Sequence, residues 1–131
     1  MRDIPVGVKG TFTMTVKEEH LASTINPTLP PVLATGWMIV MMEQAAMDAM
    51  RDYLEPGEAS VGVGINVQHL AATPIGHVVK AEAELVKVEG RKLEFKVSAF
   101  DEVESIGVGT HQRAVIQSSK FSERLASKIK R

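Results

Sequence analysis

The segment from Thr35 to Leu54 constrains the fold more than any other part of the chain, because it is typical of a helix that is apolar on almost every side. Pro56 and Gly57 follow it and end the helical pattern. Its polar side chains gather on one narrow stripe, at Gln44, Asp48, Arg51 and Asp52. A helix with so narrow a polar stripe must be wrapped by other structure, since its apolar surface would otherwise face water.

The segments around this helix alternate between apolar and polar residues, which predicts β-strands. They are residues 7–17, 60–71, 77–89, 92–100 and 106–117. The four that follow the helix are joined by short turns, so we expect them to be antiparallel neighbours. One antiparallel sheet with one apolar helix against it is an α+β domain. With 131 residues, the chain is expected to form a single domain over residues 1–131.

Residues 18–34, called the lid segment below, precede the helix and contain Pro27, Pro30 and Pro31. Proline-rich backbone cannot carry helix or central-strand hydrogen bonding, so the segment is predicted to be an ordered loop or a flap. Long loops in small domains are often functional lids, and a plain connector is the alternative.

The C-terminal residues 119–131 are predicted to form a short helix or tail. Phe121, Leu125 and Ile129 recur every four positions, as on one face of a helix. The segment also holds the chain's basic cluster, formed by Lys120, Arg124, Lys128, Lys130 and Arg131. A docked helix with a solvated basic face is preferred to a tail that binds nucleic acid.

The charge balance and the N-terminus limit the classes of partner. Fifteen basic residues against 16 acidic ones give a net charge of -1, so no long-range positive field draws in nucleic acid. The N-terminus lacks the apolar core of a signal peptide, and nothing approaches the run of about 18 apolar residues that a membrane span needs. The chain is therefore expected to be cytoplasmic, with neither nucleic acid nor membrane as a partner.

The sequence predicts no metal site and no cofactor. The absence of cysteine excludes disulfides, thiolate metal sites and a cysteine nucleophile. His20 and His77 lack metal-ligand spacing, and there is no Walker, dinucleotide-binding or G-x-S-x-G motif.

Glu43 interrupts the apolar surface of the helix. On a helix, the surface neighbours of a residue lie three, four and seven positions away. For Glu43 all of these are apolar: Gly36, Ile39, Val40, Ala46, Met47 and Met50. The carboxylate is therefore expected on the core side, where it needs donors, a proton or a wet cavity. A functional carboxylate is preferred, and the alternative is a Glu satisfied by a buried network or reaching an unoccupied interface.

A histidine is expected to project from a second apolar face. The segment 60–71 places four apolar residues on one expected face, at Val61, Val63, Ile65 and Val67. His69 continues this alternation, and a lone histidine there is usually a satisfied core residue. Together, however, a Glu and a His that converge on one pocket form an acid–base pair. Thr35 begins the helix, where a hydroxyl either caps the helix or joins amide donors that favour an oxyanion.

Other candidates lie on neighbouring strand segments. His111 and Arg113 are two positions apart on the last strand segment and therefore share a face. Arg113 either anchors a phosphate or carboxylate of a ligand or pairs with the charge of Glu43. Gly62 and Gly64 either allow a ligand to approach the backbone closely or mark a bulge.

Over nearly its whole length the chain resembles the fluoroacetyl-CoA thioesterase-like branch of the hot-dog thioesterases. The similarity is densest in LATGWMIVMMEQAAMDAM, YLEPGEASVG, VQHLAATPIG and LVKVEGRKLEFKVSAFDEVESIGVGTHQRAVI. The spacing from Thr35 to Glu43 to His69 is similar to that of the family's Thr–Glu–His catalytic set. The resemblance implies a hot-dog fold, in which a curved antiparallel sheet wraps one long central helix. It also implies a homodimer whose two sheets join, with active sites at the subunit interface.

The implied activity is hydrolysis of a small acyl-CoA to the free acid and CoA. Glu43 acts as nucleophile or as general base, His69 orients the reacting groups, and Thr35 with backbone amides stabilises the oxyanion. By the same resemblance, Gly62 offers its amide to the thioester and Arg113 lies near the catalytic groups. One alternative is a hot-dog protein that binds or sequesters an acyl-CoA or another small molecule without turnover, and a second is a hydratase on the same fold.

One feature departs from the family. Members that select the fluorinated substrate carry aromatic residues in the lid before the helix. Residues 26–33 of this chain contain none. Specificity for fluoroacetyl-CoA is therefore not expected, and the expected substrate is a general short-chain acyl-CoA or one whose acyl group the sequence does not identify.

Overall fold

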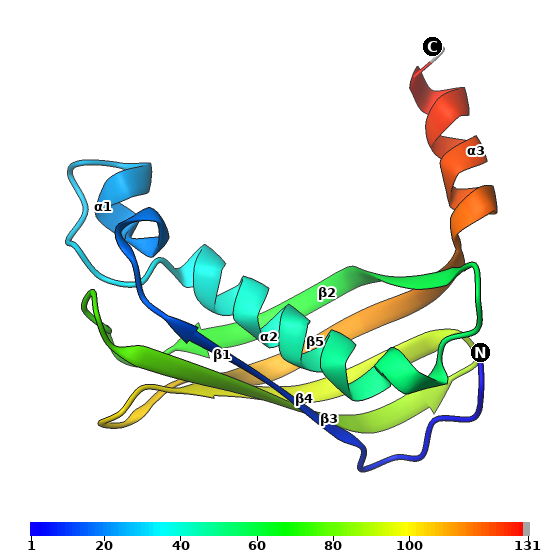
Figure 1. Cartoon of the computed structure of the whole chain (residues 1–131), viewed down its shortest axis with the longest axis horizontal. Helices are drawn as coiled ribbons and strands as arrows, with labels where there is room; N and C mark the ends of the chain where they lie inside the picture. The colour runs from blue at the N-terminus through cyan, green and yellow to red at the C-terminus, as the bar shows by residue number, and fades with distance from the viewer. Residues whose placement is uncertain (130–131) are drawn as a thin grey trace.

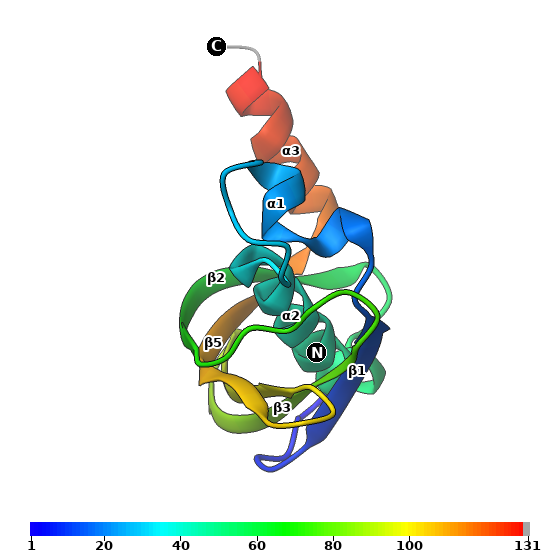
Figure 2. The same ribbon diagram turned by 90° about the vertical axis from the view of Figure 1, so that its left-hand side faces the viewer.

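In residues 1–129, which the structure describes, one long helix lies in the concavity of a five-stranded antiparallel sheet (Figure 1). The helix is α2 (Thr35–Met50), and the strands are β1 (Lys9–Thr15), β2 (Glu58–His69), β3 (Val78–Glu89), β4 (Lys92–Phe100) and β5 (Ser105–Gln117). Seen end-on, the sheet curls around the helix (Figure 2). This computed structural model confirms the predicted α+β class, a curved antiparallel sheet around one long central helix.

The apolar composition of α2 explains its position. Its buried residues are Met38, Met41, Met42, Ala45, Ala46, Ala49 and Met50. Fully burying a methionine side chain contributes about 1.5–3 kcal/mol, so this face holds the helix in the sheet. A Cβ at Gly10 of β1 would overlap the backbone of Ala45 and Ala49, so only glycine lets β1 lie this close. The α-helix ends at Met50, and a single 3₁₀ turn, η2 (Arg51–Tyr53), occupies the rest of the predicted segment.

The strands are ordered β1-β3-β4-β5-β2 across the sheet. β3–β4 and β4–β5 are antiparallel neighbours, as predicted. The same prediction is wrong for β2 and β3, because β2 pairs with β5 at one edge and β3 pairs with β1 near the other. The connection between β2 and β3 is longer than a tight hairpin loop. Its residues bind the lid segment instead, through Thr73 O with Leu33 N at 2.8 Å and a bridge between Val32 and Pro74.

A β-bulge lies in β2 between Gly62 and Gly64, which was one of the two interpretations of these glycines. Gly62 pairs with Arg113 and Gly64 pairs with Gln112, so Val63 is an inserted residue and is 58% exposed. An inserted residue reverses the alternation of faces. The prediction that Val61, Val63, Ile65 and Val67 share one face is therefore wrong. Only Ile65 and Val67, together with His69, share the face turned towards α2.

The lid segment contains more helix than predicted. Its first part forms a 3₁₀ turn, η1 (Glu18–His20), and a short helix, α1 (Ala22–Ile25). Both end before Pro27, so no proline interrupts them. The ring of His20 is buried and packs edge-on against Trp37, with centroids 4.6 Å apart. The segment is thus tied to the start of α2.

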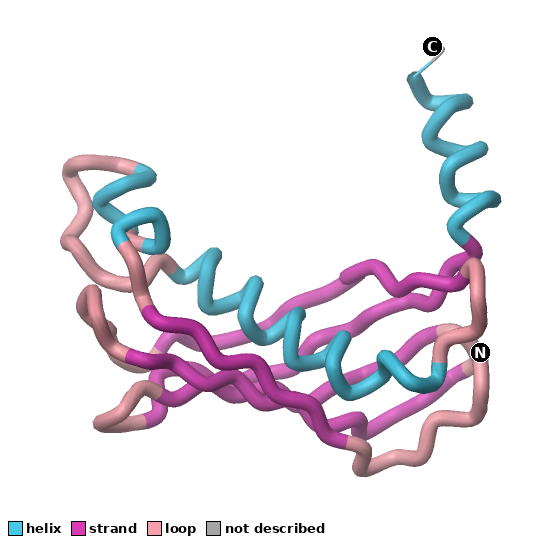
Figure 3. The backbone as a smooth tube through the Cα atoms, in the orientation of Figure 1, coloured by secondary structure: helices cyan, strands magenta, loops and turns pink. Residues whose placement is uncertain are grey.

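α3 (Ser118–Ile129) continues directly from β5 and stands away from the sheet (Figures 1 and 3). Its apolar residues Phe121, Leu125 and Ile129 are 36%, 47% and 82% exposed, so the prediction of a docked helix is wrong for the protomer. Lys130 and Arg131 of the predicted basic cluster lie outside the described residues. None of the helices in the described part of the chain is long and apolar enough to cross a membrane.

Candidate active site

Glu43 lies in the middle of α2 at the border of the core. Its side chain is 32% exposed, so it is less enclosed than the sequence predicts. Among its apolar helix neighbours, Val40 is 37% exposed, whereas Ala46 is fully buried. A Cβ placed on Gly62 of β2 would come within 2.6 Å of Glu43 Oε2. Glycine at this position is therefore what leaves room for the carboxylate beside β2.

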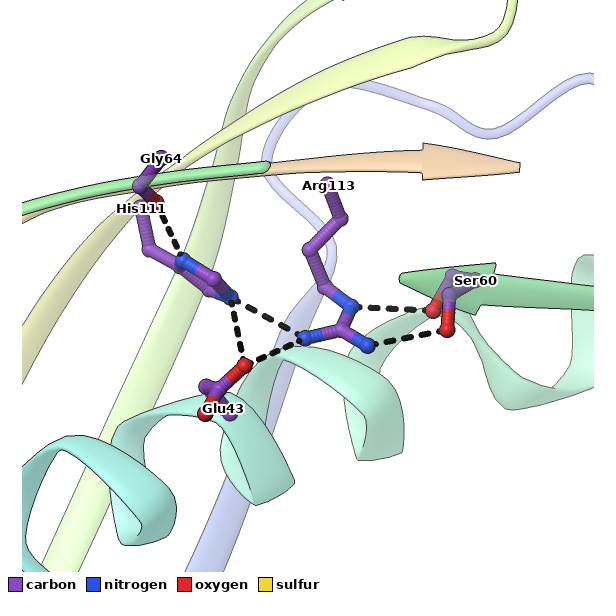
Figure 4. Close-up of polar contacts among 5 residues, drawn as sticks. All are labelled: Glu43, Ser60, Gly64, His111 and Arg113. Atoms are coloured by element: carbon purple, nitrogen blue, oxygen red, sulfur yellow. Dashed lines mark hydrogen bonds and ion pairs between the residues drawn. The ribbon is translucent and has the colours of Figure 1, made fainter. Parts of the chain in front are cut away.

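A hydrogen-bonded cluster surrounds Glu43 (Figure 4). Arg113 on β5 donates through Nη1 to Glu43 Oε2 at 3.2 Å. The same nitrogen lies 3.1 Å from His111 Nε2. Nε and Nη2 of Arg113 donate to the hydroxyl and the carbonyl of Ser60, at 2.9 and 3.0 Å. Four of the five donor hydrogens of the guanidinium are thus engaged within the protein.

Burial and pairing set the charges in this cluster. Arg113 and His111 are 3% and 2% exposed. Burial lowers the pKa of Arg113, and the nearby Glu43 carboxylate opposes this shift. The guanidinium stays charged, because arginine is not deprotonated in proteins. Burial also lowers the pKa of His111, which keeps this imidazole neutral at neutral pH. The cluster therefore holds one cation, one carboxylate and one neutral ring.

Thr35 and His69 form a second contact, from the start of α2 to the end of β2. Thr35 Oγ1 and His69 Nδ1 are 2.8 Å apart. Ala34, not Thr35, is the N-cap of α2, so the Thr35 hydroxyl does not cap the helix. Burial lowers the pKa of His69. His69 Nε2 is buried and has no hydrogen-bond partner within the described chain.

A hollow of about 380 Å³ opens at this second contact. It lies between residues 32–35, where the lid segment meets α2, and residues 69–72, which begin with the last residue of β2. Thr35 and His69 both line it. A larger hollow of about 530 Å³ lies over the C-terminal half of α2 and is lined by none of the three predicted catalytic residues. In residues 1–129 no three His, Cys, Asp or Glu side chains are grouped so that they could hold a metal ion.

The predicted catalytic residues thus fall into two groups. Thr35 lies with His69, and Glu43 lies with Arg113. Thr35 and Glu43 are eight residues apart on one helix, which corresponds to about 12 Å along its axis. A single protomer therefore does not bring all three to one reacting carbonyl. The sequence missed Ser60 and the role of His111, although the spacing of His111 from Arg113 did indicate a shared face.

Comparison with known proteins links this architecture to an enzyme family. A family model described as fluoroacetyl-CoA-specific thioesterase matches residues 16–119. A curated fluoroacetyl-CoA thioesterase from Streptantibioticus cattleyicolor is 49% identical over 114 residues, which cover 87% of this chain and 82% of that protein.

Solved structures agree in fold. A variant of the fluoroacetyl-CoA thioesterase FlK, with serine in place of one threonine and in complex with acetyl-CoA, is 44% identical with a TM-score of 0.90. The match covers 95% of this chain and 98% of that one. A hot-dog-like protein from Thermanaerovibrio acidaminovorans is 23% identical with a TM-score of 0.87, over 95% of this chain and 93% of that one. The latter similarity shows the hot-dog fold alone.

Proposed function

The chain belongs to the fluoroacetyl-CoA-specific thioesterase family, and on this premise we propose that it hydrolyses a small acyl-CoA to the free acid and CoA. The observation that carries the proposal beyond the family is the Glu43 carboxylate. It is half-exposed on an otherwise apolar helix face, and a buried Arg113 holds it in one orientation. A carboxylate held in this way is a suitable nucleophile or general base for acyl transfer.

Two routes lead to the same products. As nucleophile, the Glu43 carboxylate attacks the thioester carbonyl, the C–S bond breaks, and CoA leaves as the thiolate. Water then hydrolyses the anhydride, and neutral His69 passes a proton of that water to the thiolate. As general base, Glu43 takes a proton from the water that attacks the carbonyl. In either route, the Thr35 hydroxyl with backbone amides, including that of Gly62, stabilises the oxyanion. In the general-base route that proton passes to the leaving sulfur while neutral His69 orients the reacting groups, and in both routes Arg113 keeps the carboxylate in place.

We further propose that the protein acts as a homodimer joined through β2. This strand lies at an edge of the described sheet, so one side of its backbone has unpaired amides and carbonyls. Ile65 on β2 and Val40 on α2 are 41% and 37% exposed. A joined sheet and a second helix α2 would bury these side chains.

The dimer also accounts for the separation of the catalytic residues. A two-fold axis beside β2 pairs this strand antiparallel with β2 of the partner subunit. The His69 end of β2 in one subunit then lies beside the first residues of β2 in the partner subunit. The partner subunit's Glu43 then approaches the Thr35–His69 contact. The buried and unpartnered Nε2 of His69 supports this arrangement, because it needs a polar partner that the described chain lacks.

The substrate class follows from the family and the lid segment. FlK, to which this chain is similar, has been solved in complex with acetyl-CoA. Residues 26–33 of this chain carry no aromatic side chain, so the proposed substrate is a short-chain acyl-CoA without selection for fluorine. A cytoplasmic location, and the absence of nucleic acid and membrane as partners, remain predictions from the sequence.

The decisive experiment is to measure free thiol released from a panel of acyl-CoAs of increasing chain length and polarity. We expect release from at least one short-chain member at a rate that saturates with substrate. Tight binding without thiol release would indicate a sequestering protein instead. Addition of water to an enoyl-CoA, followed by loss of its ultraviolet absorbance, would indicate a hydratase.

A further inference from the structure

His111 is a buried titratable residue that neither route of hydrolysis uses. It lies on β5, on the face turned towards α2, and its side chain is 2% exposed. Its Nδ1 is 2.7 Å from the Gly64 carbonyl oxygen, and its Nε2 is 3.1 Å from Arg113 Nη1. Both ring nitrogens thus have a partner, and each partner can take only one role in a hydrogen bond.

These two partners determine the tautomer of His111. A carbonyl oxygen only accepts, so Nδ1 carries the proton and donates it to Gly64. A guanidinium only donates, so Nε2 is unprotonated and accepts from Arg113. The geometry therefore requires the neutral ring with the proton on Nδ1. Glu43 Oε2 lies 4.0 Å from Nε2, and Arg113 Nη1 bridges these two acceptors.

The bulge in β2 makes this arrangement possible. The carbonyl that accepts from His111 belongs to Gly64, the residue directly after the inserted Val63. A bulge disrupts the ladder locally and turns backbone groups away from it. A Cβ on Gly64 would meet the amide oxygen of Gln112, so a larger residue there would displace the end of that side chain.

We propose that His111 is a positioning residue for the Glu43 carboxylate, acting through Arg113. Its Nε2 provides a fixed acceptor for one hydrogen of Nη1, and the other hydrogen of that nitrogen then points at Glu43. Ser60 fixes the far side of the guanidinium through Nε and Nη2. Without His111, the guanidinium would turn about its Ser60 contacts and its contact with Glu43 would no longer be directed. This inference rests on the proposed function only in assigning Glu43 a role in thioester hydrolysis.

Two substitutions separate orientation from folding. The amide oxygen of His111→Gln reaches the region of Nε2 and can accept from Arg113. His111→Leu fills the site and accepts nothing. We expect kcat for acyl-CoA hydrolysis to fall about 10- to 100-fold in His111→Leu, the effect typical of removing a partner that orients a functional group. KM should change far less, because His111 does not touch the substrate, and His111→Gln should restore most of kcat. His77→Gln, a histidine outside the cluster, is the matched control and should leave kcat unchanged.

A double-mutant cycle tests whether the effect passes through the guanidinium. On an Arg113→Lys background no oriented guanidinium remains, so His111→Leu should cause little further loss of kcat. If the loss of kcat in the double variant equals the product of the losses in the two single variants, the proposal is overturned. Equal losses of kcat in His111→Gln and His111→Leu would also overturn it. So would a melting temperature low enough in both variants for unfolding to explain the lost activity.

A measurement without substrate keeps this inference separate from the proposed function. In ¹⁵N-labelled protein at pH 7, the His111 ring should give the signals of the neutral tautomer protonated at Nδ1. The Arg113 Nη1 hydrogens, which contact His111 and Glu43, should be protected from exchange in the wild type and in His111→Gln, and should exchange faster in His111→Leu. A protonated ring, or the other tautomer, would overturn the inference even if the enzyme is active. Inactivity of the wild type on every acyl-CoA, with these signals as expected, would reject the proposed function and leave the orientation of Arg113 supported.

Discussion

The Thr35 hydroxyl lies 2.8 Å from Nδ1 of His69, joining the first turn of α2 to the last residue of β2. Glu43 stands about two turns further along the same helix, where Arg113 holds it instead. The chain therefore presents two groups of polar residues, called half-sites below: one pairs a hydroxyl with an imidazole, and the other holds an oriented carboxylate.

Glu43→Gln is expected to lower kcat/KM by about a thousandfold or more, because the amide is neither nucleophile nor base. The substitution keeps the size of the side chain, and its oxygen can still accept from Arg113, so the fold should be retained. Asp52→Asn is the matched control, since that carboxylate is 89% exposed outside both half-sites and should not affect turnover. Thiol release and circular dichroism measure both variants. Near-normal turnover in Glu43→Gln would contradict the proposed role of the carboxylate.

Thr35→Ser is expected to retain most activity, and Thr35→Val to lose about 10²- to 10³-fold in kcat. Serine keeps the hydroxyl that contacts His69, whereas valine keeps the shape and removes the donor. Because Thr35 does not cap α2, neither change should shorten the helix. Thiol release at saturating acetyl-CoA distinguishes the two variants. Equal loss in both would show that the methyl group of Thr35, not its hydroxyl, matters.

Acid is expected to destabilise the protein as the pH falls below about 6.5. Burial lowers the pKa of both His69 and His111 below their ordinary value of 6.5, so the unfolded chain binds these protons first. Stability is therefore fully present above pH 6.5 and is lost as the pH falls through the folded pKa values. Each histidine gives a slope of at most about 1.4 kcal/mol per pH unit.

Urea unfolding at a series of pH values measures this slope. Glu58, whose pKa is lowered to about 2 mainly by the Glu55 backbone amide, adds its own acid dependence only below the ordinary glutamate pKa of 4.5. The window above that value thus isolates the histidines. His111→Gln should reduce the slope there. An unchanged slope would contradict the expected neutral, buried ring.

The sequence was sufficient for the main elements of the fold because their signals are local. The apolar run predicted α2, and two-residue alternation predicted all five strands to within a few residues. The partnership of β2 with β5 was missed, because strand order depends on contacts distant in the sequence. The bulge reversed a predicted face, since alternation cannot reveal that one residue, Val63, is left out of the pairing.

The site was predictable only in part for the same reason. Glu43 was found because its helix neighbours are apolar, and Arg113 because it lies among apolar residues on a strand. The position of His111 was visible, but its function was not, because it depends on a Gly64 carbonyl that the bulge turns inward. The apolar face of α3 contradicts the expected docking, since Phe121 and Leu125 are 36% and 47% exposed.

Selectivity for fluorine should be weak. With no aromatic residue in positions 26–33, the lid segment offers no flat side chain that closes over the acyl group. The ratio of kcat/KM for fluoroacetyl-CoA over acetyl-CoA should therefore be set by the intrinsic reactivity of the two thioesters. To test this, the enzymatic kcat/KM ratio is compared with the ratio of rate constants for hydroxide-catalysed hydrolysis of the same two thioesters. An enzymatic ratio about 100-fold above the chemical one would show selectivity from a source other than aromatic residues in the lid segment.

Mixed dimers provide the sharpest test of how the two half-sites combine. Glu43→Gln and His69→Ala are each expected to be inactive alone. If Glu43 serves the partner's Thr35 and His69, a dimer of one Glu43→Gln and one His69→Ala chain has one intact site and one doubly damaged site. Random exchange of equal amounts makes half of the dimers mixed, so activity should recover to about a quarter of the wild-type value. If each site uses residues of one chain, every site in the mixture stays damaged and no activity returns. Co-refolding the two variants and measuring thiol release decides between these outcomes. A mixture of Glu43→Gln with Glu43→Gln,His69→Ala is the matched control, because no pairing of these chains supplies a carboxylate.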